Sequence, residues 1–160
     1  MKKIWTIILV IGVVCGMTAC SDDDDKEVPK ELVGEWELIK MEIGTLDASD
    51  ADVKEIAEDM FTELSKEFYY GESLELNSDG TGVFKDGDIE YYTKKDVFTM
   101  IDEEGYSMSF TYKISGSKLI MTLNMRDMII NEMADELDKE ELNYLKSTLK
   151  KFTVDFTFQK

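Results

Sequence analysis

Carboxylates dominate the side chains of this 160-residue chain that could take part in catalysis. It has 35 Asp and Glu against 18 Lys and Arg, a formal charge of −17, and no histidine. The usual general base, the Ser-His and Cys-His nucleophile pairs and imidazole ligation of metals are therefore excluded. Two carboxylates at a set separation can hydrolyse a glycoside, but the run Asp102-Glu103-Glu104 is uninformative among 35 acids. We expect a non-enzymatic protein with no cofactor and no metal. We also expect no nucleic-acid partner, because the acidic surface repels nucleic acid. An enzyme without histidine is the remaining alternative.

Two other patterns have the residue types of binding sites. Glu75-x-Asn77-x-Asp79-Gly80, followed by Asp86, has the ligand spacing of a calcium loop. Strand-like sequence flanks it where helices would be needed, so a β-hairpin is the preferred interpretation. The tyrosine pairs at 69–70 and 91–92 each place one ring inward and one outward if the chain is extended, and an exposed ring could stack on a sugar. Isolated exposed tyrosines are common, and an ordinary surface is the alternative.

The first residues have the three parts of a secretory signal: two lysines, an apolar run over 4–14 and small residues before Cys20. The run is shorter than the roughly 20 residues of a membrane span. Its end, Met17-Thr18-Ala19-Cys20, resembles the lipobox of bacterial lipoproteins, in which the cysteine is acylated, with palmitate-type chains, and becomes the mature N-terminus. The resemblance implies a signal peptide over 1–19 and a membrane anchor at Cys20. An ordinary secreted protein is the alternative.

A dense acidic segment follows the cysteine. Ser21, Asp22, Asp23, Asp24 and Asp25 begin a stretch over 20–30 that cannot bury apolar surface and is expected to be an extended tether. It resembles the export tag of surface-exposed lipoproteins in some Gram-negative bacteria, which implies an outer-membrane, lipid-anchored location at the cell surface. A solvated spacer facing the periplasm is the alternative.

From about residue 31 to residue 160 the pattern is that of one mainly β domain. Alternation is clearest over 106–114, 119–125 and 152–158, and short apolar runs separated by turn residues bring the total to about eight strands. Such spacing predicts an antiparallel barrel or sandwich.

Two amphipathic segments, about 50–69 and 127–151, interrupt the strands as helical insertions. In the first, apolar residues from Val53 to Phe68 repeat at i, i+3 and i+4. In the second, Asp138 to Glu141 could cap a new helix, so that one long helix and two short ones are both compatible with the pattern. Both insertions need an apolar surface and are expected to cover the open end or the outer wall of a barrel.

Three motifs resemble the lipocalin-like domains of secreted bacterial lipoproteins. They are Gly34-Glu35-Trp36, the Leu-x-Leu-x-x-Asp-Gly-Thr-Gly-x-Phe hairpin over 74–84, and the stretch 112–119. The resemblance implies an up-and-down barrel of about eight strands, with Gly34 and Trp36 marking its closed floor. Classical members place an arginine after the last strand to stack on the tryptophan, whereas the only arginine here is Arg126.

The inward methionine and aromatic positions are candidates for lining a cavity in such a barrel. An eight-stranded barrel has room for packed side chains or for one small ligand, and methionine adapts to varied shapes. One hypothesis is therefore an apolar-ligand binder, with the helix at 53–68 as a lid. The other is an interaction module for a surface protein, with a solid interior and an exposed apolar patch on the helices. The candidate cavity residues are Met100, Met108, Phe110, Tyr112, Met121, Met125, Phe156 and Phe158.

Overall fold

The computed structural model describes residues 27–160, which form an eight-stranded closed barrel with three helices. Each strand pairs antiparallel with its neighbour in sequence, and the last pairs with the first. This confirms the predicted mainly β, lipocalin-like up-and-down barrel. The strands are β1 (Gly34–Ala48), β2 (Ser73–Leu76), β3 (Thr81–Phe84), β4 (Gly87–Lys94), β5 (Val97–Asp102), β6 (Ser107–Ser115), β7 (Lys118–Asn124) and β8 (Leu149–Gln159).

The interior faces follow the alternation expected from the sequence. On β8 the residues Phe152, Val154, Phe156 and Phe158 are buried, and on β7 so are Leu119, Met121 and Leu123. Because side chains alternate across a strand, each of these sets faces the same side. The β3–β4 turn has two central residues, Lys85 and Asp86, with φ of 53° and 63°. A two-residue turn with both φ values positive suits the twist of a hairpin.

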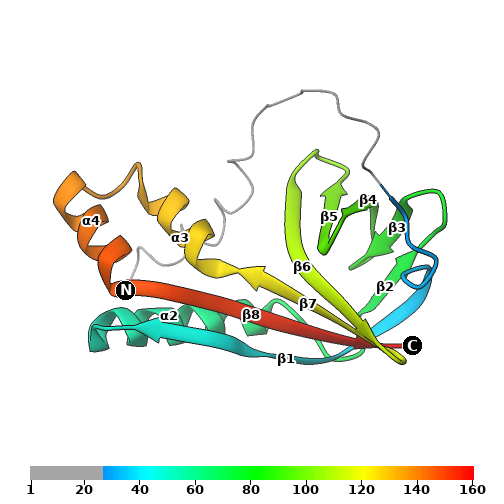
Figure 1. Cartoon of the computed structure of the whole chain (residues 1–160), viewed down its shortest axis with the longest axis horizontal. Helices are drawn as coiled ribbons and strands as arrows, with labels where there is room; N and C mark the ends of the chain where they lie inside the picture. Colours follow the sequence, from blue (N-terminus) through cyan, green and yellow to red (C-terminus); the bar gives the residue numbers. More distant parts are fainter. Residues whose placement is uncertain (1–26) are drawn as a thin grey trace.

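The lengths of the strands are unequal, and this difference positions the helices. Strands β1 and β8 pair over Glu37 to Ala48, with three register shifts along the way, and run on well past the short strands β2 and β3 (Figure 1). Helix α2 (Ala51–Lys66) packs on β1 and β8, and α3 (Met125–Met133) and α4 (Lys139–Thr148) pack on β8. All three helices therefore gather at one end of the molecule, around the extended β1–β8 ribbon.

Local capping explains where the helices begin. The Asp50 carboxylate accepts hydrogen bonds from the backbone N–H of Asp52 and Val53 at the start of α2. Asp138 and Glu141 form a reciprocal capping box at the start of α4. The second predicted insertion is thus two helices, in line with the capping signal at Asp138. It begins slightly earlier than the expected 127, at Met125.

Candidate functional site

The barrel interior contains a cavity of about 80 Å³, enclosed by apolar side chains. Six of the eight residues that we expected to line a cavity contribute to it: Met100, Met108, Phe110, Met121, Phe156 and Phe158. Leu74, Phe84 and Phe68 complete the lining. Elsewhere in the barrel aromatic rings pack on one another, as in the stack of Tyr91 on Phe98 with ring centroids 5.4 Å apart.

The other two expected cavity residues lie outside this lining. The Tyr112 ring packs edge-on against Phe98, with centroids 6.4 Å apart. Met125 was expected to be the last inward residue of a strand, and this local expectation is wrong: β7 ends at Asn124 and Met125 is the first residue of α3. The Asn124 side chain accepts a hydrogen bond from the Asp127 N–H and so starts a helix where the apolar alternation would have continued a strand.

Phe68, two residues beyond α2, closes the cavity. Its ring packs against Phe156 at 5.1 Å and Phe84 at 6.2 Å between centroids, and the Lys85 ammonium lies 3.7 Å from its centre. The ligand-binding hypothesis included the helix over 53–68 as a lid. The part of that segment that lines the cavity is this single ring, while α2 itself packs on β1 and β8.

The opposite end of the barrel is closed around Trp36. Its indole is buried and donates a hydrogen bond to the Leu32 carbonyl at 2.7 Å. The Lys160 ammonium lies 4.5 Å from the indole centre and donates to the carbonyls of Glu31 and Val33. Gly34, with φ of +134°, leaves the space that Lys160 occupies, since a Cβ there would lie 3.1 Å from Lys160 Cε. The residue after the last strand therefore does place a cation on the tryptophan, but it is a lysine.

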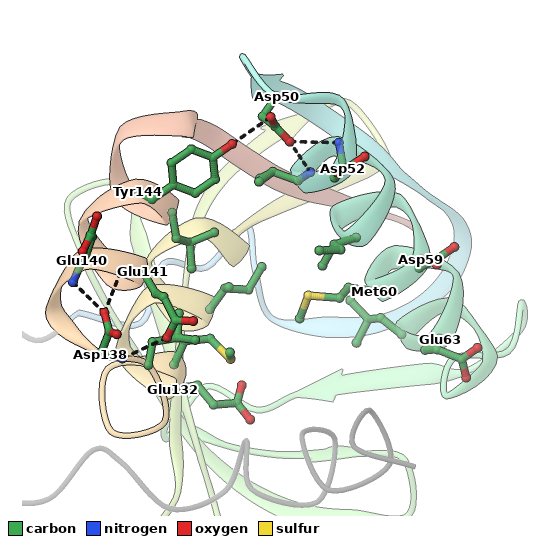
Figure 2. Close-up of a pocket in the computed structure, with 17 residues that line it drawn as sticks. Asp50, Asp52, Asp59, Met60, Glu63, Glu132, Asp138, Glu140, Glu141 and Tyr144 are labelled. Atoms are coloured by element: carbon green, nitrogen blue, oxygen red, sulfur yellow. Dashed lines mark hydrogen bonds between the residues drawn. The ribbon is translucent and has the colours of Figure 1, made fainter. Parts of the chain in front are cut away.

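A much larger hollow, of about 890 Å³, lies between α2 on one side and α3 with α4 on the other (Figure 2). We call it the inter-helix groove. Two of its lining residues, Ile56 at 59 % exposure and Tyr144 at 53 %, have large side chains that are left open to solvent. The apolar floor consists of Val53, Ile56, Met60 and Leu64 from α2, Ile129 and Met133 from α3, Leu137 from the connection, and Leu145 from α4.

The rim of the inter-helix groove is acidic on both sides (Figure 2). Glu63 pairs with Lys66, and Asp50, Asp138 and Glu141 serve as helix caps. No lysine or arginine of the described chain lines the groove, so its potential is negative. The eight rim carboxylates are Asp50, Asp52, Asp59, Glu63, Glu132, Asp138, Glu140 and Glu141.

Glu132 is the rim residue in the least favourable position. Its Oε1 atom is buried without a hydrogen-bond partner in the described part of the molecule. Burial, with a smaller contribution from the nearby Glu136 charge, raises the pKa of Glu132. A buried carboxylate oxygen without a hydrogen-bond partner lowers the stability of the fold, so Glu132 is a destabilising residue of the groove wall.

One hydrogen bond ties the two walls together. The Tyr144 hydroxyl on α4 donates to Asp50 Oδ2 at the start of α2, at 2.8 Å (Figure 2). This bond, followed by the helix-cap bond from the Val53 N–H, lowers the pKa of Asp50, and the same partner raises the pKa of Tyr144. The bond spans one end of the groove.

The remaining sequence motifs have structural roles. The calcium-like spacing falls on the β2–β3 hairpin, where Asp79 Oδ1 accepts hydrogen bonds from the N–H and hydroxyl of Thr81. Among residues 27–160 no group of three or more acidic or cysteine side chains is arranged to hold a metal ion. Tyr91 is buried, as alternation predicts, whereas Tyr69 and Tyr70 both point outward, at 70 % and 72 % exposure, because they lie in a turn.

The predicted anchor and tag, Cys20 with Ser21 and Asp22 to Asp25, lie outside the described residues. Within residues 27–160, no helix is both long and apolar enough to cross a membrane.

The fold therefore defines a closed, lipocalin-like up-and-down barrel with a helical groove appended at one end. Comparison with protein-family models, with curated proteins and with solved structures finds no match for this chain.

The interaction-module hypothesis expected an exposed apolar patch on the helices, but the sequence did not locate it in a groove between them. The apolar stripes of both helical segments were evident, but each was expected to be covered by the barrel. The available signal was the set of acids flanking both stripes, such as Asp59 and Glu63 beside Met60. In a chain with 35 acids these residues look like an ordinary solvated face.

Proposed function

We propose that this protein is a non-enzymatic docking module of the bacterial cell envelope, which binds an apolar segment of a partner in the inter-helix groove. The observation that carries the proposal is the groove itself, about 890 Å³ with an apolar floor open to solvent. Pockets that hold drug-sized ligands measure about 300–1,000 Å³. At about 80 Å³ the barrel cavity is well below that range, which favours the interaction module over a carrier of lipids in the barrel.

Photo-crosslinking in cells tests this role. A benzophenone amino acid placed at Ile56, in the groove, should give a discrete adduct that is lost when Met60→Lys is added. Ile39 is the matched control, because it is also an exposed isoleucine, at 37 %, but lies on β1 outside the groove. Equal adducts from positions 56 and 39, or none from 56, would contradict docking in the groove.

The barrel cavity can be tested separately by native mass spectrometry. A carrier would be recovered with a bound lipid, whereas a docking module would be recovered without one. A lipid that is displaced by Met108→Trp, which fills the cavity, would transfer the binding role to the barrel.

We further propose that Cys20 is acylated and anchors the protein at the outer membrane, with the acidic tether directing it to the cell surface. Two or more acyl chains give stable anchoring, whereas one chain binds only marginally. Metabolic labelling with an alkyne-tagged palmitate should mark the protein, and Cys20→Ser should abolish the label. Protease treatment of intact cells should remove the domain; full protection would place it on the periplasmic side.

A further inference from the structure

The floor of the inter-helix groove has the shape of a helix-binding surface. On α2 the apolar residues Val53, Ile56, Met60 and Leu64 recur every three or four positions and so form one stripe along the helix. At 1.5 Å per residue this stripe is about 16 Å long, roughly three helical turns. Ile129, Met133 and Leu145 face it from the other wall. An elongated partner of about three turns would match this length.

The chemistry of the floor favours a helix over an extended peptide. The floor presents aliphatic and thioether groups, which offer no strong hydrogen-bond donors or acceptors. An extended segment lying there would leave backbone N–H and C=O groups unpaired, at a cost for each group that is buried. The described residues that line the groove belong to helices and their connections, so it offers no strand edge to which a partner strand could add. A helix satisfies its own backbone and presents only side chains.

The rim decides the charge of the occupant. Eight carboxylates surround the floor, and Asp52, Asp59 and Glu140 form no ion pair within residues 27–160. Like charges repel, so the chain's own acidic tether and the same face of a second copy are poor occupants. Lysine and arginine side chains can lay their aliphatic stems along the floor and place their charged ends at the rim.

We infer that the groove binds a cationic amphipathic helix, with apolar residues on one face and lysine or arginine on both flanks. This inference rests on the docking role proposed above and specifies its partner. Met60 and Met133, both part of the floor, can adapt to differing apolar side chains. Recognition would then depend on the pattern of charge and apolar spacing rather than on one sequence.

Synthetic peptides test the inference on the full-length protein in zwitterionic nanodiscs, with empty nanodiscs as the reference. The first peptide carries leucines at i, i+3, i+4 and i+7, lysines on the flanks and a benzophenone residue on its apolar face. The second has glutamate in place of each lysine. The third has the sequence of the first, with two central residues replaced by proline to prevent a helix. We expect only the first to crosslink to α2 and α3, and its binding to weaken as salt is raised.

Rim variants provide the matched comparison. D59N/E63Q/E140Q should weaken the lysine peptide about tenfold, since exposed ion pairs contribute about 0.2–1 kcal/mol each. E35Q/E75Q/E90Q removes the same number of charges from outward positions on β1, β2 and β4 and should leave binding within about twofold. Equal losses in the two triple variants would overturn the inference, because the effect would then be one of net charge.

The outcomes separate this inference from the docking role. Crosslinking of the glutamate or proline peptide as strong as that of the lysine peptide overturns the cationic-helix inference and leaves docking in place. If the lysine peptide does not crosslink but the cellular adduct at position 56 persists, the cationic-helix inference is likewise overturned and the docking role stands. An adduct at 56 with the mass of two copies of this chain would identify the occupant as a second copy and also overturn the inference. Absence of both the peptide crosslinks and the cellular adduct overturns the docking role as well.

Discussion

The barrel cavity and the floor of the inter-helix groove are both lined by apolar side chains but differ about tenfold in free volume, 80 against 890 Å³. In the barrel, closure by β1 and β8 brings rings into contact from all sides, and Phe68 fills the opening. At the groove, α2 and the α3–α4 pair each pack on the strands, and the space between them stays open. Apolar side chains are thus structural where the backbone encloses them and accessible where it does not.

The strongest test of this contrast is truncation of a buried barrel ring. Phe98 is fully buried and packs against Tyr91, Phe110 and Tyr112. Phe98→Ala should lower the free energy of unfolding by about 3–5 kcal/mol, since it removes apolar contacts and leaves a cavity. Urea denaturation followed by tryptophan fluorescence measures the loss. Ile56→Ala in the groove is the control and should change stability by no more than about 0.5 kcal/mol. A large loss at Ile56 would mean that the groove is part of the core.

The closed end of the barrel provides a second, smaller test. Lys160→Met removes the cation over Trp36 and two hydrogen bonds to carbonyls. We expect a loss of about 1 kcal/mol, as for exposed cation–π contacts, together with a change in the Trp36 emission spectrum. Lys160→Arg should retain most of the stability, and Lys113→Met, on the outer wall of β6, should have no effect on Trp36. No difference between Lys160→Met and Lys113→Met would show that the contact is incidental.

We expect one substitution in the groove wall, at Glu132, to raise the free energy of unfolding. Glu132→Gln removes a carboxylate whose Oε1 is buried and unpaired and should stabilise the fold at pH 7 by less than about 1 kcal/mol, because the rest of the group is screened by solvent. The raised pKa of Glu132 means that the folded wild type holds its proton more tightly than the unfolded chain. The cost is therefore full above the folded pKa and disappears as the pH falls below the unfolded value.

Thermal unfolding of Glu132→Gln and wild type from pH 7 to pH 4 measures that dependence. The two melting temperatures should converge as the pH falls. Glu55→Gln, at an exposed position of α2 outside the groove, is the matched control. A difference that stays constant with pH would show that the carboxylate charge is not the cause.

The smallest expected effect concerns the bond that spans the end of the groove. Tyr144→Phe removes the hydroxyl that donates to Asp50, so the pKa of Asp50 should rise toward its ordinary value. Because a lowered carboxylate pKa stabilises the fold above that pKa and the contribution is lost on acidification, the variant should be slightly less stable at neutral pH. Carboxyl NMR titration measures the shift. Asp79, whose pKa is lowered by Thr81 in the β2–β3 hairpin, serves as the internal reference and should not move.

Much of the barrel could be predicted from the chain because each step depended on local pattern. Alternation identified β6, β7 and β8, and Asp138 marked a helix start, since caps and alternation are properties of neighbouring residues. The beginning of α3 at Met125 was misjudged because the apolar side chain of Met125 continues the alternation of apolar and polar residues along β7. Lys160 was overlooked because only arginine was considered as the cation over Trp36.

That the two helical segments form a groove could not be predicted, because they are about 80 residues apart in the chain. Their separation depends on how far β1 and β8 extend beyond the other strands and on three register shifts between them. Those shifts arise from long-range pairing, which short-range patterns do not specify. Ile56 illustrates the result: its spacing predicts a buried position, yet it is 59 % exposed.

The bridge between Glu27 and Thr93 has a consequence for how the molecule would stand on a membrane. It fixes the beginning of the described chain at the same end of the barrel as Trp36 and Lys160, opposite the helices (Figure 1). With a lipid at Cys20, the barrel would lie between the bilayer and the helices, and the inter-helix groove would face away from the bilayer. A fluorophore at position 56 should then be less quenched by spin-labelled lipid headgroups than one at Lys118, the first residue of β7. The length of the barrel would thus set the height at which a partner is met.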